Sequence, residues 1–85
     1  SEGVQVMAGV VVQPGTSIGK DAIVNTGARI DHDCFIGDGS HICPGATLAG
    51  SVKVGEQSLV GSGATIIPNV RVSERSLVRA GSLML

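Results

Sequence analysis

Residues 24–54 read VNTGARIDHDCFIGDGSHICPGATLAGSVKV, and every sixth residue of this stretch, counted from Val24, is aliphatic. The same spacing continues in both directions without a change of phase, from Val6 to Met84. A small or β-branched residue stands four positions after each of these residues up to Val78. A short, uninterrupted repeat is typical of a solenoid, in which each coil buries its inner face only against neighbouring coils. We therefore predict an all-β fold, a left-handed parallel β-helix of about four to five triangular coils of three hexapeptides each.

Turn-forming residues mark the corners of these coils, at the fourth position of each hexapeptide. At the first corner a glycine, which adopts positive φ without steric cost, recurs every 18 residues, the length of one coil: Gly9, Gly27, Gly45, Gly63 and Gly81. The second corner carries residues that mostly tolerate a left-handed or turn conformation, namely Gly15, Asp33, Ser51 and Asn69. The third corner fits such a conformation less well, with Asp21, Gly39, Gln57 and Arg75.

Side chains alternate along a strand, so the residues beside each inward aliphatic residue point outward and form three outer faces. The first face includes Ile23, His41, Leu59 and Leu77, the second Val11, Arg29, Thr47 and Thr65, and the third Ser17, Phe35, Lys53 and Arg71. The first face thus has an apolar column that is interrupted only by His41. Because an exposed apolar column usually marks an interface, we predict a homotrimer that packs partly through the first face.

The composition limits the classes of function. The 85 residues form one small domain, and a net charge of −1 without a Lys/Arg cluster argues against nucleic-acid binding. No apolar run approaches the length of a membrane span, and no signal peptide is visible. The two cysteines make no disulfide framework, because Cys34 falls on an inward position and Cys43 on an outward one. A reducing cytoplasm is the expected compartment.

Two histidines are the candidates for chemistry. His32 lies in Asp31-His32-Asp33, at the corner between the second and third faces, and an adjacent carboxylate would suit it to act as a general base. His41 projects from the first face, with Asn25 one coil below. The alternatives are a solvated corner histidine for His32 and an interface histidine for His41.

The spacing of the histidines decides where a shared site can lie. Nine residues separate His32 from His41, which is half a coil and about 30 Å of strand path. Within one subunit they cannot share a site, whereas between subunits they can. Metal catalysis is disfavoured: the gamma-class carbonic anhydrases are left-handed β-helices that bind zinc through three histidines, and this chain has two, without that spacing.

Several short segments also resemble a known family. They are VNTGA at 24–28, IDHDC at 30–34, IGD at 36–38, SHI at 40–42, PGA at 44–46 and LAG at 48–50. They resemble the sugar acetyltransferases of the NeuD/PglD type, which are hexapeptide-repeat enzymes that acetylate sialic acids or UDP-4-amino-sugars. The resemblance extends over almost the whole chain. It implies acetyl-CoA as co-substrate, no metal, a small-molecule sugar acceptor, and active sites between the subunits of a homotrimer.

The resemblance also implies roles for residues on both histidine segments. His32 matches the general base that takes the proton from the acceptor amine or hydroxyl, and Asp33 matches the acidic residue that orients this base. Relatives often have Glu at the position of Asp33, so its reach is shorter here. His41 matches a histidine near the acetyl group, and Asn25 matches a polar residue that lines the cleft.

Two glycines are implied in binding the coenzyme. Gly50 matches a residue whose backbone N–H donates a hydrogen bond to the thioester oxygen and stabilises the oxyanion. Gly61 is assigned with Gly50 to the coenzyme-binding residues. The resemblance therefore implies direct acetyl transfer without a covalent enzyme intermediate.

The sequence also departs from this family. We expect residues 1–85 to form a single β-helix domain without the N-terminal acceptor-binding domain of the relatives and their C-terminal extension. Arg79 also replaces a glycine that is usual there. An acetyltransferase is the leading hypothesis, with transfer to oxygen or nitrogen left open. The alternative is a non-catalytic β-helix, a scaffold or oligomerisation module that has lost acceptor recognition.

Overall fold

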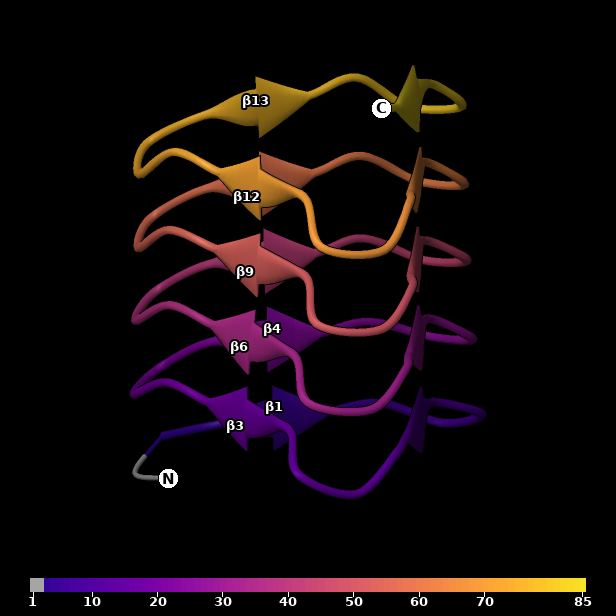
Figure 1. The fold of residues 1–85 in the computed structure, drawn as a ribbon. Helices are drawn as coiled ribbons and strands as arrows, with labels where there is room; N and C mark the ends of the chain where they lie inside the picture. The colour runs from indigo at the N-terminus through magenta and orange to yellow at the C-terminus, as the bar shows by residue number, and fades with distance from the viewer. Residues whose placement is uncertain (1–2) are drawn as a thin grey trace.

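Residues 3–85, which the computed structural model describes, wind into stacked triangular coils that rise from one end of the stack to the other (Figure 1). This part of the chain contains fourteen strands of two residues each, in three parallel sheets. It contains no helix that is long and apolar enough to span a membrane. The stacked parallel strands confirm the predicted left-handed β-helix, at between four and five coils.

Each face of the stack is one sheet. The first sheet contains β1 (Gln5–Val6), β4 (Ile23–Val24), β7 (His41–Ile42), β10 (Leu59–Val60) and β13 (Leu77–Val78). The second sheet contains β2 (Val11–Val12), β5 (Arg29–Ile30), β8 (Thr47–Leu48), β11 (Thr65–Ile66) and β14 (Leu83–Met84). The third sheet contains β3 (Ser17–Ile18), β6 (Phe35–Ile36), β9 (Lys53–Val54) and β12 (Arg71–Val72).

The register confirms the predicted coil of 18 residues. On the first sheet Ile23 pairs with His41, and His41 pairs with Leu59. On the third sheet Phe35 pairs with Lys53, and Lys53 pairs with Arg71. Residues 18 positions apart therefore stand one above the other, and each outer face is a set of vertical columns.

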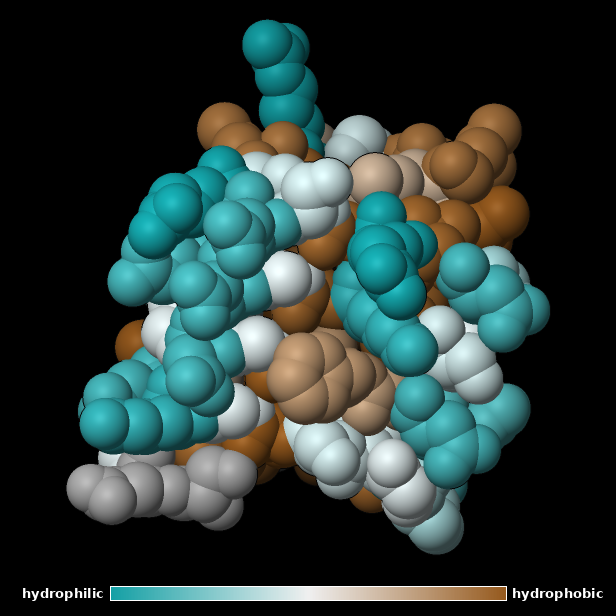
Figure 2. All heavy atoms as spheres, turned by 60° about the vertical axis from the view of Figure 1, so that its left-hand side comes forward, coloured by the Kyte–Doolittle hydropathy of each residue, from teal (hydrophilic) through white to brown (hydrophobic). Residues whose placement is uncertain are grey.

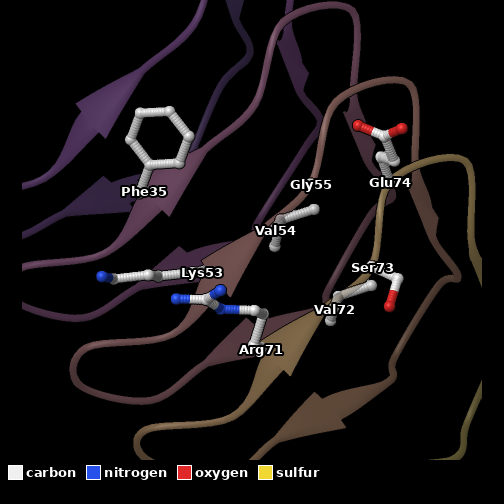
Figure 3. A pocket seen from close by; sticks show the side chains of 8 residues that line it. All are labelled: Phe35, Lys53, Val54, Gly55, Arg71, Val72, Ser73 and Glu74. Atoms are coloured by element: carbon white, nitrogen blue, oxygen red, sulfur yellow. The ribbon is translucent and has the colours of Figure 1, made fainter.

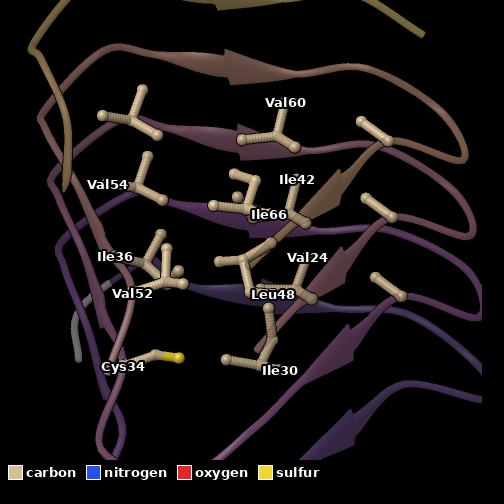
Figure 4. Close-up of a cluster of buried hydrophobic side chains, with 14 of the residues drawn as sticks. Val24, Ile30, Cys34, Ile36, Ile42, Leu48, Val52, Val54, Val60 and Ile66 are labelled. Carbon is tan, nitrogen blue, oxygen red and sulfur yellow. The ribbon is translucent and has the colours of Figure 1, made fainter. Parts of the chain in front are cut away.

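The core is the stack of inward aliphatic side chains inside the triangle (Figure 4). Ten of them are at most 1% exposed: Val24, Ile30, Ile36, Ile42, Leu48, Val52, Val54, Val60, Ile66 and Val72. Full burial of one such side chain contributes about 1.5–3 kcal/mol to folding. Val6 and Val12, in the first coil, are 51% and 39% exposed, because that coil has a neighbour on one side only.

All three corners have the same backbone conformation, which the sequence predicted only in part. Asp21, Gln57 and Arg75 at the third corner have φ of 58°, 54° and 55°, although two of these side chains have no preference for positive φ. Hydrogen bonds between coils impose it: the N–H of Gln57 donates to the Asp38 carbonyl at 2.8 Å, and that of Arg75 to the Glu56 carbonyl at 2.9 Å. The stacking of coils therefore overrides local propensity at this corner.

Buried hydroxyls connect successive coils at one inner edge. The Ser40 hydroxyl donates to the Gly55 carbonyl at 2.8 Å and accepts from the N–H of Ser58 at 3.1 Å. The Ser58 hydroxyl repeats this pattern one coil higher, with the Ser73 carbonyl at 2.9 Å and the N–H of Ser76 at 3.2 Å. Both serines are almost fully buried. Each is satisfied by two hydrogen bonds, so polar groups are accommodated inside the coil.

Candidate active site

His32 lies at the second corner, between β5 and β6, and its side chain is 59% exposed. Its backbone N–H donates to Asp31 Oδ1 at 2.7 Å, which uses the carboxylate of Asp31 to shape the corner. Its ring Nδ1 lies 3.2 Å from Asp33 Oδ2. An ionised carboxylate only accepts hydrogen bonds, so this contact places a proton on Nδ1, and in the neutral ring Nε2 is then the nitrogen with the lone pair. Asp33, rather than Asp31, is therefore the carboxylate that orients His32.

The imidazole of His32 lies against Gly50, which stands one coil higher at the same corner. A Cβ placed on Gly50 would lie 2.5 Å from His32 Nε2 and 2.7 Å from Cε1, closer than real atoms approach. Gly50 does not have the positive φ that would require glycine at a corner. Its missing side chain is therefore the space that His32 occupies, and the nitrogen with the free lone pair lies beside the Gly50 backbone.

The backbone N–H of Gly50 has no hydrogen-bond partner within residues 3–85, and Gly50 itself is buried, with the His32 ring against it. Within residues 3–85 the Gly50 carbonyl accepts from the N–H of Asn69 at 3.0 Å, but no group accepts from the Gly50 N–H. A basic nitrogen and an unpaired N–H donor thus lie together on one corner of one subunit. Sequence reasoning named both residues and missed their contact. The signal was present, because Gly50 is the one glycine at the third position of any hexapeptide.

The other histidine, His41, contacts Asn25 on the first sheet. Asn25 Nδ2 is 3.2 Å from His41 Nε2. The side-chain oxygen Oδ1 of Asn25 accepts hydrogen bonds from the Thr26 N–H at 2.7 Å and from the Thr26 hydroxyl at 3.2 Å. These bonds turn the side-chain amide nitrogen toward His41. An amide nitrogen only donates, so His41 Nε2 accepts and its Nδ1 carries the proton. His41 is thereby prepared to donate a hydrogen bond.

The structure keeps the two histidine sites apart within one subunit. His32 belongs to the corner between the second and third sheets, and His41 to β7 in the middle of the first sheet. His32, Asp33 and Gly50 therefore form one cluster, and His41 with Asn25 forms another.

Gly61 stands apart from both clusters. It lies on the first face just after β10, and its N–H donates to the Val78 carbonyl at 2.7 Å. A Cβ on Gly61 would meet the backbone of Val78 and Ala80 in the next coil. Coil packing is therefore a sufficient reason for glycine at this position, and the role of Gly61 in coenzyme binding stays a prediction.

The cysteines lie where the repeat predicted them. Cys34 is 2% exposed in the core, whereas Cys43 is half-buried on the first face, and both thiols are free. Burial raises the pKa of the Cys34 thiol and also that of Cys43. Both are therefore thiols rather than thiolates near neutral pH, which makes them poor nucleophiles. Among residues 3–85 no three His, Cys, Asp or Glu side chains converge as a metal site would require.

The chain is similar to known transferases: a family model matches part of it, and solved structures match it over its whole length. Residues 33–68 match the family model of the bacterial transferase hexapeptide (six repeats). A perosamine N-acetyltransferase from Caulobacter crescentus, solved as a histidine-to-asparagine mutant in complex with CoA and GDP-perosamine, is 38% identical with a TM-score of 0.91. The acetyltransferase domain of PglB from Neisseria gonorrhoeae, in complex with acetyl coenzyme A, is 35% identical with a TM-score of 0.89.

These likenesses cover 100% of this chain, which spans 43% and 44% of those two chains. Serine acetyltransferase isoform 3 from Entamoeba histolytica, at 21% identity and a TM-score of 0.60, shares the fold alone. Residues 33–68 therefore carry the repeat of the bacterial hexapeptide transferases, and the chain is a hexapeptide-repeat β-helix that is similar throughout its length to sugar acetyltransferases.

Proposed function

We propose that this β-helix is the catalytic part of an acetyl-CoA-dependent acetyltransferase that acts on the amine of a sugar or nucleotide sugar. One observation carries the proposal: the His32 ring, whose Nδ1 contacts Asp33, has its Nε2 beside the backbone of Gly50, whose N–H is unpaired within residues 3–85. A base and an oxyanion donor within one cluster are what direct acyl transfer requires. The similar structures that contain CoA or acetyl coenzyme A, one of them with GDP-perosamine, support the choice of substrates.

In this mechanism His32 Nε2 takes a proton from the acceptor nitrogen while that nitrogen bonds to the thioester carbon. The Gly50 N–H donates to the carbonyl oxygen as negative charge develops there. His32 then returns the proton to the departing thiolate when the carbon–sulfur bond breaks. Asp33 holds the imidazole and stabilises its charged form, in the manner of a base-orienting carboxylate. A hydroxyl acceptor would follow the same path.

The role of His41 requires a second subunit. We place it near the acetyl group of a neighbouring subunit's site, in a cytoplasmic homotrimer whose active sites lie between subunits. The Nδ1–H that Asn25 leaves on His41 supplies a donor for a bound carbonyl. The exposed apolar side chains of the first sheet, Leu59 at 38% and Leu77 at 68%, support an interface on this face.

Replacing His32 tests the proposal. The change His32→Ala removes the base, so kcat should fall by about 10²–10⁴-fold, whereas the oligomeric state and melting temperature should stay unchanged because His32 is exposed. Release of free thiol from acetyl-CoA in the presence of a nucleotide-linked amino sugar measures the transfer. Asp33→Asn keeps an acceptor but loses the charge, and should cause a smaller loss. Unchanged turnover in His32→Ala would rule out the assigned base, and a wild-type protein that neither binds coenzyme A nor transfers acetyl groups would favour a scaffold.

A further inference from the structure

The third sheet carries a column of side chains that neither the core nor the proposed mechanism uses. Phe35 on β6, Lys53 on β9 and Arg71 on β12 pair in register, one above the other. All three are exposed, and Phe35 is 48% exposed although it is the single aromatic residue of the chain. Figure 3 shows the Lys53 and Arg71 side chains side by side, extending in the same direction on the side of the Phe35 ring.

A groove of about 480 Å³ lies along this column, lined by the three side chains and by Gly55, Ser73 and Glu74 among others. Gly55 packs tightly against the next coil, since a Cβ there would collide with the backbone of Glu74. Figure 3 places Glu74 on the opposite rim from Lys53. The groove therefore has one cationic side, one acidic rim and an aromatic end.

A second hollow, of about 410 Å³, lies on the other side of the same two cations. It is lined by Lys53 and Arg71 together with Ser51, Asn69 and Asp33, the carboxylate that orients His32. Lys53 and Arg71 thus line both hollows, and one of the two reaches the corner that holds the proposed base. A ligand bound along the cations would be continuous with the site of transfer.

The two cations are available to an anion. Within residues 3–85 neither Lys53 nor Arg71 forms an ion pair, whereas Glu74 lies 3.8 Å from Arg75 on the far rim. Side chains on adjacent strands start about 4.8 Å apart, which suits two cations to hold neighbouring phosphate groups. Asp21, Asp38 and Glu56 line a separate hollow at the third corner, together with Lys20. Figure 2, which turns the left-hand side of Figure 1 forward, shows hydrophilic side chains gathered in separate groups with hydrophobic surface between them.

We propose that Lys53 and Arg71 bind the diphosphate of a nucleotide substrate whose reactive end reaches His32, with Phe35 providing a surface on which the base stacks. This inference rests on the proposed acetyltransferase function, since it assigns the diphosphate-binding residues of that same site. Arginine binds phosphate oxygens through a planar fork and lysine through a compact charge, and exposed aromatic rings stack on bases. Coenzyme A and a nucleotide sugar both carry a diphosphate, so either could occupy this site. Titration with each ligand separately shows which of the two binds there.

Calorimetric titration of the purified protein with coenzyme A, with UDP or GDP, and with pantetheine distinguishes the sources. Lys53→Gln and Arg71→Gln should each weaken binding of the diphosphate ligand by about tenfold, the usual effect of losing one hydrogen bond to a charged group. Pantetheine, which has no phosphate, should bind each variant as it binds the wild-type protein. A change confined to coenzyme A identifies the coenzyme as the occupant, and a change confined to UDP or GDP identifies the acceptor.

Lys20→Gln is the matched control, because it removes the same charge from an exposed lysine at the third corner. Unchanged affinities in both groove variants, or an equal loss in Lys20→Gln, would overturn the inference while leaving the transferase function in place. A different outcome separates the two proposals. If the groove variants lose affinity but the wild-type protein shows no acetyl transfer, the proposed function is refuted and the diphosphate site still stands.

Discussion

At the scale of single residues, the contact between His32 and Gly50 explains an exception in the repeat. Third-position residues of the hexapeptides carry side chains everywhere except at Gly50, and alanine occupies this position at Ala8 and Ala80. The backbone at this position accepts a Cβ, so the restriction at Gly50 comes from the imidazole of His32 in the coil below. A glycine that looks like part of the turn pattern therefore leaves the space that the His32 ring occupies.

Gly50→Ala tests this contact. The new methyl group would overlap the His32 ring and displace it from Asp33 and from the Gly50 N–H, and a displacement of about 1 Å is enough to lower kcat by about 100-fold. Circular dichroism and melting temperature should not change. Ser62→Ala, at an exposed third position of another coil, is the control and should retain full activity. Wild-type turnover in Gly50→Ala would contradict the positioning role.

At the scale of the strand and its coil, a buried polar group stabilises the fold only when it forms hydrogen bonds. Ser40→Ala should lower the free energy of unfolding by about 1–3 kcal/mol, because it leaves the buried N–H of Ser58 without its acceptor. Alanine itself fits this column, since Ala22 occupies it one coil below. Urea-induced unfolding measures the difference. Ser17→Ala, at an exposed position of β3, should change stability little, and an equally small effect for Ser40→Ala would contradict the proposed ladder.

Cys34 makes stability depend on alkaline pH. Burial raises the pKa of its thiol above the ordinary 9.0, so the unfolded thiol ionises first and the free energy of unfolding should fall as pH rises through 9.0. Below that pH the thiol is protonated in both states and contributes no pH dependence. Cys34→Val should reduce the alkaline loss and fold normally, because Val52 stands in the same column. Urea unfolding midpoints at pH 7 to 10 test this, and identical pH profiles for both proteins would refute it.

At the scale of the whole molecule, the first sheet decides whether the two histidine clusters can meet. Leu59→Glu places a charge in the apolar column and should convert the proposed trimer to monomers, because a buried unpaired charge is costly. Acetyl transfer should be lost with the trimer, since His41 would no longer reach a neighbouring site. Analytical ultracentrifugation measures the mass. Leu83→Glu, on the second sheet and 60% exposed, is the control, and a trimeric, active Leu59→Glu protein would contradict an interface on the first sheet.

The hexapeptide spacing predicted the coil length, the three sheets and the inside or outside position of the side chains. It could do so because the first residue of each hexapeptide points inward and its two neighbours point outward. It predicted less at the third corner, where Gln57 and Arg75 adopt positive φ through contacts with other coils. It also missed the His32–Gly50 contact and the Lys53–Arg71 groove. Both depend on how a side chain turns once it leaves the backbone, and periodicity contains no information about that direction.

The stacking of identical corners also determines how this fold responds to insertions and deletions. Loss of 18 residues would remove one coil and leave every later column on its own face, so that a site would only move along the axis. Loss of six residues would keep every aliphatic side chain in the core, yet it would rotate all later residues onto the next face. Such a deletion, if it fell between the paired residues, would leave the core intact but would separate His32 from Gly50 or Lys53 from Phe35. Length changes of whole coils are therefore the ones by which such a protein can diversify while keeping its chemistry.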